Sequence, residues 1–105
     1  MSKKIVLVTG INGLVGSAIA SLANKYSNYE FVGCTHKECD LTKEVRVENL
    51  FKTVKPDYVI HTAARVGGIG RNLKSPAQQY YSNILMNAHV IHHACLLYTS
   101  DAADD

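Results

Sequence analysis

Short apolar runs alternate along the chain with segments whose apolar residues recur every three or four positions. The run KIVLV, residues 4–8, has no polar alternation, which is typical of a strand covered on both faces. Further short strands are expected at residues 30–34 and 57–61. We therefore expect three parallel strands, with residues 4–8 in a central position.

Three helical patterns follow these strands. The first continues through about Lys25, and the second ends before Pro56, which cannot continue a helix. The third is expected to begin with Ser75 as N-cap and Pro76 as first helical residue, with Gln78 placed to reach back as in a capping box. The apolar positions of the three are Val15, Ile19, Leu22, Ala23 and Tyr26; Val47, Leu50, Phe51 and Val54; and Tyr81, Ile84, Leu85, Ala88 and Ile91.

Strand and helix alternate three times in about a hundred residues, the pattern of right-handed crossovers that build a parallel sheet. The sequence therefore predicts an α/β fold. More specifically, it predicts the N-terminal part of a doubly wound parallel sheet, a Rossmann fold, with three strands and crossover helices.

Composition limits the classes of protein that fit. The 105 residues suffice for one domain, and 47% apolar with 19% charged residues is a globular composition. The net charge of +2 comes from scattered lysines and arginines, so we expect neither nucleic acid nor a membrane as partner. Three cysteines, an odd number with no leader sequence ahead of them, predict reduced thiols in the cytoplasm.

The glycines after the first strand are spaced to bind a phosphate group. Gly10, Gly13 and Gly16 stand in VTGINGLVG, a variant of the dinucleotide-binding fingerprint with one more residue between the first two glycines. The spacing allows a tight turn at Gly10, approach of a pyrophosphate to the backbone at Gly13, and close packing of helix and strand at Gly16. The helix N-terminus favours the anion. Isolated matches are often ordinary turns, but the strand before and the helix after favour dinucleotide binding.

His36 and Lys37 follow the second strand, where the adenosine ribose of a dinucleotide is expected. An acidic residue there would select NAD, whereas a basic group accommodates the 2′-phosphate of NADP. Lysine binds phosphate as a point charge, and His36 can donate to the same group. These residues favour NADP(H), with a solvated polar turn as the alternative.

Asp40 and Thr42 precede the second helix. At least one of them is expected to cap that helix through its side-chain oxygen. The carboxylate of Asp40 could also accept a hydrogen bond from the adenine amino group. Both roles can hold on different residues.

Two groups of residues invite comparison with zinc sites. They are Cys34, His36 and Cys39, and the pair His89 and His93 at helical spacing. Neither group has a second ligand pair at the spacing of a structural zinc site. We therefore expect no metal, and interpret the histidines as surface or helix-packing residues.

Several segments together resemble one family. VTGINGLVGSAI, CDLT, KPDYVIHTAARVGGIGRN, SPAQQYYSN and MNAHVIHHA are similar to the N-terminal part of the GDP-L-fucose synthases, which are extended short-chain dehydrogenase/reductases. The resemblance covers residues 3–94, and AARVGGI with Asn72 is its most specific part. It implies an NADPH-dependent 3,5-epimerase/4-reductase that converts GDP-4-keto-6-deoxymannose to GDP-L-fucose, homodimeric at full length.

The resemblance also implies roles for residues after the third strand. Ala63 and Ala64 would be small because they pass close to the cofactor, and Asn83 matches an asparagine that helps to hold it. Arg65 and Arg71 could meet phosphate or sugar oxygens, with exposed loop charges as an equal alternative. The candidate cofactor-binding residues are Gly10, Asn12, Gly13, Leu14, Val15, Gly16, His36, Lys37, Asp40, Leu41, Ala63, Ala64, Arg65 and Asn83.

Catalytic residues are not expected in this sequence. The family's proton donor is a Tyr-x-x-x-Lys pair, and none of the six tyrosines has a lysine four positions later. We therefore expect the cofactor-binding part of an enzyme. The alternatives are part of another nucleotide-sugar epimerase or dehydratase, and a nucleotide-binding module without catalysis.

The final residues, CLLYTSDAADD, break the pattern. Where the resemblance would require a glycine turn, a basic pair and a fourth strand, the chain has a short apolar group and an acidic tail. The letters resemble the translation of a transposase adapter used to prepare sequencing libraries. We divide the chain into a partial NADP(H)-binding Rossmann domain, residues 1–94, and a non-native tail, residues 95–105. Residues 96–105 are expected to extend the last helix without a packing partner or to trail into solvent.

Overall fold

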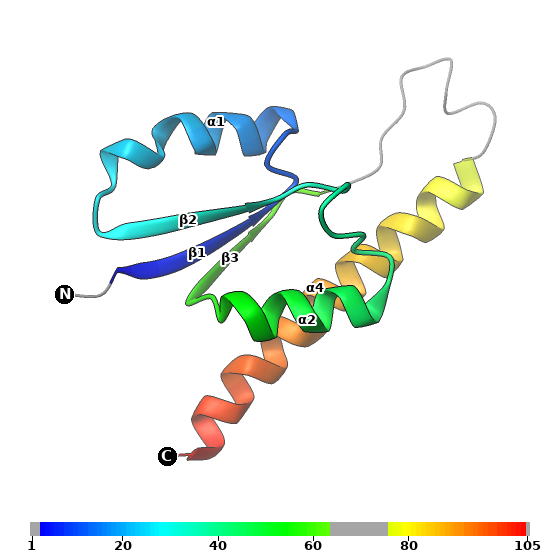
Figure 1. Ribbon diagram of the computed structural model, residues 1–105. Coiled ribbons are helices and arrows are strands. Elements are labelled where there is room, and N and C mark those ends of the chain that lie inside the picture. The colour runs from blue at the N-terminus through cyan, green and yellow to red at the C-terminus, as the bar shows by residue number, and fades with distance from the viewer. Residues whose placement is uncertain (1–2, 64–75, 105) are drawn as a thin grey trace.

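The computed structural model describes residues 3–63 and 76–104, with side chains described up to residue 97 (Figure 1). Strands and helices alternate as the apolar pattern predicts. The elements are β1 (Lys4–Thr9), α1 (Leu14–Leu22), the 3₁₀ turn η1 (Ala23–Lys25), β2 (Tyr29–Cys34), α2 (Glu44–Val54), β3 (Tyr58–His61) and α4 (Pro76–Asp104).

The three strands form one parallel sheet in the order β2-β1-β3. Leu7 in β1 lies opposite Val32 in β2 and Val59 in β3. Because β1 has a hydrogen-bonded neighbour on each side, its residues 6–9 are buried. This confirms the central position of the first strand and the fold expected from the sequence, the N-terminal part of a doubly wound sheet.

The two faces of the sheet are covered differently. Helix α1 lies over one face, and α2 with α4 lies over the other (Figure 1). The main buried cluster is on the α2–α4 side, where it joins the sheet to both helices. Its members are Leu7, Cys34, Cys39, Leu41, Val47, Phe51, Met86 and Val90. The fold is therefore held together mainly from one side.

Helix α2 is amphipathic as predicted and ends where expected. Val47 and Phe51, one turn apart, are its buried residues, and Lys55 takes a left-handed conformation with φ of 50° before Pro56. Its N-terminus differs from the prediction, because the N-cap is Lys43 and no side chain caps the helix. Asp40 instead accepts hydrogen bonds from the amide and hydroxyl of Thr42, so the expected cap is wrong.

Helix α4 begins at Pro76 as predicted, while Ser75, its expected N-cap, lies outside the described residues. The helix has apolar residues on two faces. Met86 and Val90 are buried against the core, whereas four of the five predicted apolar positions, Tyr81, Ile84, Ala88 and Ile91, are exposed. The predicted apolar stripe is therefore present on α4 but faces outward, and the face that carries Met86 and Val90 packs on the core instead.

The face under α1 is only partly covered. Val15, Leu22 and Tyr26 from the predicted apolar face of this helix are exposed, and a groove of about 500 Å³ runs between the sheet and the end of the helix. The groove is lined by Val6, Tyr26, Tyr29, Phe31, Tyr58, Val59 and Ile60. Helix α1 alone does not cover this side of the sheet.

The C-terminal residues continue α4 through Asp104. Leu97 packs against the core cluster, so the expectation that residues after 95 lack a packing partner is wrong at this position. Among the described residues, none of the helices has both the length and the apolar character needed to traverse a membrane.

Candidate dinucleotide-binding site

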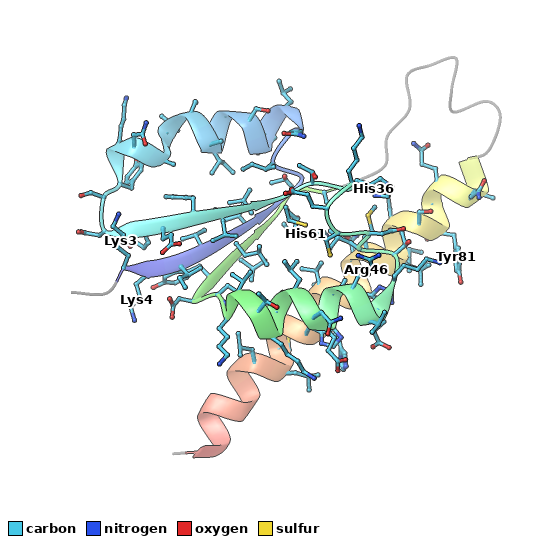
Figure 2. All side chains as sticks on the ribbon, in the orientation of Figure 1. Lys3, Lys4, His36, Arg46, His61 and Tyr81 are labelled. Carbon is cyan, nitrogen blue, oxygen red and sulfur yellow. The ribbon has the colours of Figure 1, made fainter. Side chains whose placement is uncertain are left out.

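The carboxyl ends of all three strands meet at one edge of the sheet. The turn after β1, the turn after β2 and the end of β3 come together there, and Figure 2 shows His36 and His61 near this edge, with Lys3 and Lys4 at the opposite one. The chain passes from β1 to β2 on one side and then to β3 on the other. Ligands of open α/β sheets bind at such a reversal, beyond the strand ends.

Two of the three glycines are required by close backbone contacts. Gly10 has a φ of 69°, and a Cβ there would lie 2.8 Å from the Cα and N of Ala63. A Cβ on Gly16 would overlap the carbonyl oxygen of Gly10. These contacts bring the first turn of α1 against the end of β1, and the end of β3 against the same turn.

Gly13 has a different environment, because it is exposed and serves as the N-cap of α1. No side chain caps this helix, and its first turn contains no acidic residue. Asn12, Val15 and Leu14 are also exposed, the last at 92%. No side chain accepts a hydrogen bond from the N–H groups at this helix end. A helix N-terminus of this kind can bind the phosphates of a dinucleotide.

The turn after β2 is held by its own hydrogen bonds. The carboxylate of Glu38 accepts from the amide and hydroxyl of Thr35, and the Thr35 hydroxyl accepts from the Glu38 amide. His36 and Lys37 lie in this turn and are exposed. The carboxylate of Glu38 is thus engaged within the turn, and the side chains of His36 and Lys37 lie on its surface.

Asp40 is half-buried, whereas Leu41 is buried at 3% exposure in the core cluster. The Leu41 side chain is therefore not available to a ligand at the sheet edge. The Leu41 carbonyl oxygen lies 2.8 Å from Nδ1 of His89, which donates to it. This contact ties the segment before α2 to α4 and gives His89 a packing role, as one reading of the sequence proposed.

A group of polar residues that sequence reasoning missed joins β1, β3 and α4. The buried Thr9 hydroxyl oxygen lies 3.1 Å from the Thr62 amide, 3.2 Å from the Ala63 amide and 2.6 Å from Nδ1 of His61. Nε2 of His61 lies 2.7 Å from the side-chain oxygen of Asn87. The signal in the sequence was a threonine ending a buried strand and a histidine ending its neighbour.

These contacts fix the directions of the hydrogen bonds. Two amides donate to the Thr9 oxygen and use both of its lone pairs, so its proton is donated to Nδ1 of His61. Nδ1 is then an acceptor, and the proton of the neutral ring is on Nε2, from which it is donated to Asn87. This relay positions Thr62 and Ala63 beside Gly10.

The remaining residues of the prediction divide between described and undescribed parts of the chain. Ala63 is half-buried against Gly10, and Asn83 is half-buried on α4, one helical turn before Asn87. Ala64, Arg65 and Arg71 lie outside the described residues. The described part of the site therefore comprises the glycine turn, the start of α1, the turn after β2 and the end of β3.

Two buried thiols lie below the site. Burial raises the pKa of Cys34 to about 12, and the neighbouring Cys39 thiol contributes to the same shift. Burial also raises the pKa of Cys39. Both thiols are consequently protonated and unreactive near neutral pH.

Comparison with known proteins agrees with this geometry. The model of the NAD dependent epimerase/dehydratase family matches residues 6–100. This chain belongs to that family. GDP-L-fucose synthase 1 of Arabidopsis thaliana is 43% identical over 89 residues, which are 85% of this chain and 28% of that protein.

Solved structures of similar proteins share the fold. A GDP-L-fucose synthetase from Naegleria fowleri bound to NADP is 28% identical with a TM-score of 0.82, over 92% of this chain and 31% of that one. The GDP-mannoheptose C4 reductase MlghC of Campylobacter jejuni, with NADP bound, is 29% identical with a TM-score of 0.83, over the same two shares. This member of the epimerase/dehydratase family thus spans under a third of each relative.

Proposed function

We propose that this chain is the NADP(H)-binding N-terminal part of a GDP-L-fucose synthase, an enzyme that epimerises and reduces GDP-4-keto-6-deoxymannose. One observation carries the proposal: the uncapped start of α1 and the basic turn at His36 and Lys37 lie at the same edge of the sheet. The first suits a pyrophosphate and the second suits the 2′-phosphate of NADP. The similarity to the Arabidopsis enzyme supports the choice of nucleotide sugar.

The residues present fit the cofactor. In this proposal, Asn12, Leu14 and Val15 bind the phosphates through backbone N–H groups. Gly13, whose own N–H donates to the Gly10 carbonyl, lets the phosphates approach the backbone, while Gly10 and Gly16 give the turn its shape. His36 and Lys37 bind the 2′-phosphate, and Asp40 with the Leu41 backbone borders the adenine. Ala63 and Ala64 leave room beside the ring systems, and Arg65 and Asn83 complete the site. NADPH held by these residues would supply the hydride that reduces the 4-keto carbon of the sugar.

Two other functions fit part of the observations. The Campylobacter reductase acts on a different GDP-sugar, so another nucleotide-sugar epimerase or reductase remains the second candidate. A module that binds a nucleotide without turnover is the third. Turnover of GDP-4-keto-6-deoxymannose by the full-length protein, followed as loss of NADPH absorbance, separates the first candidate from both.

Cofactor preference tests the basic turn directly. We expect the full-length protein to bind NADPH more tightly than NADH, and the double variant His36→Asp with Lys37→Ala to lower that ratio at least about tenfold, the equivalent of one lost charge-assisted contact. Lys25→Ala removes an exposed lysine in η1, which follows the far end of α1, and serves as the matched control. Titration by NADPH fluorescence gives both constants, and an unmodified protein that prefers NADH would refute the assignment.

The full-length enzyme is proposed to be a homodimer. The exposed residues Tyr81, Ile84, Ala88 and Ile91 repeat at alternating spacings of three and four along α4, the spacing of a helix that packs along another helix. A two-fold axis would bring the same stripe of a second copy against it. Light scattering should show a dimer for the full-length protein and a monomer for Ile84→Glu with Ile91→Glu, while Gln78→Glu, off the stripe, stays dimeric.

We propose that the full-length protein is cytoplasmic and that the last residues of this chain are not part of it. The free cysteines of residues 1–94, Cys34 and Cys39, suit the reducing cytoplasm, which cell fractionation tests. We also propose a division of the chain. Residues 1–94 are the partial Rossmann domain, and residues 95–105 are a tail that does not belong to the natural protein. Resequencing the locus from genomic DNA without adapter chemistry tests this, because recovery of codons for LLYTSDAADD would refute it.

A further inference from the structure

A second cluster of chemically active side chains lies between α2 and α4, on the helix layer that covers the core side of the sheet. Glu44 comes from the first turn of α2, and His92 and His93 come from the middle of α4. Each offers one ligand atom, and the three atoms lie within 4.8 Å of one another. None of the three residues takes part in the proposed cofactor site.

His93 is the buried member of this cluster. Its exposure is 9%, and its Nε2 has no hydrogen-bond partner among the described residues. A carboxylate oxygen of Glu44 lies 3.6 Å from this nitrogen, which is too long for a hydrogen bond. A buried nitrogen without a partner costs free energy, so this atom calls for an explanation.

The surroundings of His93 fix its ring in place. The ring of Phe51 from α2 lies 6.4 Å from it, and the ring of His92 meets it edge-on at 5.1 Å. Glu44 and His92 are exposed, so their longer or freer side chains can adjust. A rigid buried nitrogen with two adjustable ligands beside it suits an ion that enters from the solvent side.

We propose that Glu44, His92 and His93 bind one zinc ion that joins α2 to α4. Two imidazole nitrogens with one carboxylate oxygen form a donor set that zinc uses with water in the fourth position. Tetrahedral zinc with bonds of 2.0–2.1 Å to nitrogen places its ligand atoms about 3.3 Å apart, so small side-chain rotations from the present spacing suffice. Calcium and magnesium are disfavoured, because they take mainly oxygen ligands.

The ion would give Nε2 of His93 the partner that it lacks and would hold the start of α2 against α4. The sequence led us to expect no metal, since the pair His89 and His93 has no second ligand pair at the spacing of a structural zinc site. In the structure His89 is bonded to the Leu41 carbonyl instead, and the ligand facing His93 comes from a segment 49 positions earlier. Spacing along the chain does not show such a cluster.

Equilibrium dialysis of the 105-residue chain against zinc, read by elemental analysis, tests the site. We expect one zinc ion per chain at pH 7. Replacing a ligand should weaken binding at least as much as the 10–100-fold loss known for residues that only support a ligand, so Glu44→Gln and His92→Gln should each raise the dissociation constant at least about tenfold. Because the side chains of Glu44 and His92 are exposed, we expect neither replacement to unfold the chain.

Glu48→Gln is the matched control, because Glu48 lies one turn further along α2 and pairs with Lys52. This variant should bind zinc as the unmodified chain does. A cobalt-substituted sample should lack the near-ultraviolet thiolate absorption that cysteine ligands would give. The proposal is overturned if the chain takes up no zinc, or if Glu44→Gln and His92→Gln bind it as tightly as Glu48→Gln. In those cases the contact between Glu44 and His93 is an ion pair alone.

Discussion

At the scale of single residues, the Thr9 hydroxyl joins three segments through hydrogen bonds. Thr9→Val keeps the shape of the side chain but leaves the amides of Thr62 and Ala63 without their acceptor and Nδ1 of His61 without its donor. We expect the free energy of unfolding to fall by about 2 kcal/mol, because buried polar groups lose their partners. Urea unfolding followed by circular dichroism at low protein concentration measures this.

The control for that prediction is Thr9→Ser, which keeps the hydroxyl and loses one methyl group. It should cost about 1 kcal/mol, as for other small losses of buried volume. Equal losses for the two variants would mean that packing, and not the hydroxyl, matters at this position.

The raised pKa of Cys34 predicts both its reactivity and an effect of pH. With a pKa of about 12, Cys34 has almost no thiolate at pH 8, so iodoacetamide should modify the exposed Cys95 first, as mass spectrometry of timed samples would show. The neutral thiol is favoured in the folded state. Its contribution to stability is therefore complete below the ordinary pKa of 9.0 and is lost as the pH rises toward 12. Modification of Cys34 as fast as Cys95 in the folded chain would contradict this.

At the scale of elements, the join between β1 and α1 depends on Gly16. A side chain there meets the Gly10 carbonyl, which is backbone and has little room to move. Gly16→Ala should lower the free energy of unfolding by about 3 kcal/mol, as overpacking does. Gly13→Ala is the matched comparison, since its Cβ would meet only the Gly10 oxygen at 3.3 Å, and it should cost about 1 kcal/mol or less. Thermal unfolding of the two variants side by side distinguishes them, and a similar loss for both would argue against the contact.

The elements themselves follow from local patterns in the sequence. A continuous apolar run marked β1, and Pro56 and Pro76 marked one helix end and one helix start, because these signals act over a few residues. The cap of α2 was mispredicted because Asp40 and Thr42 bond to each other. The buried face of α4 was not predictable either. Two of its faces are apolar, and only the position of α2 decides which one packs on the core.

The site shows the same division. The glycine turn could be predicted, because the spacing of its glycines is visible in the sequence and the positive φ at Gly10 is one that glycine adopts readily. The relay from Thr9 through His61 to Asn87 joins residues 52 and 26 positions apart, so it depends on the strand order. The side chain of Leu41 lies in the core cluster, so the predicted cofactor contact of this residue could involve only its backbone, and a single sequence does not show which way a residue before a helix points.

At the scale of the whole molecule, the face of the sheet under α1 determines how the isolated chain behaves. Tyr58 and Ile60 are exposed there at 51% and 36%, beside the groove that reaches Tyr26 and Phe31. Exposed apolar surface of this kind binds hydrophobic dyes and promotes self-association. The chain alone should therefore enhance the fluorescence of anilinonaphthalene sulfonate and sediment faster as its concentration rises.

Tyr58→Thr with Ile60→Thr should weaken both effects, since threonine suits a strand and is less apolar. Val45→Thr, an exposed apolar residue on α2 away from the groove, is the control and should change neither. If the unmodified chain stays monomeric at all concentrations and does not enhance the fluorescence of the dye, this apolar face is not exposed in solution and the prediction is wrong.

The one-sided core also has a consequence for how the molecule opens. Segments with few buried contacts unfold locally at a lower free-energy cost than the core to which they are attached. Helix α1 contributes no residue to the core cluster, whereas α2 and α4 supply four of its members, Val47, Phe51, Met86 and Val90. Amide protons of α1 should therefore exchange with deuterium well before those of β1 and α2. The helix end proposed to bind the phosphates would belong to the least stable cooperative unit, so a bound dinucleotide would slow exchange there more than anywhere else.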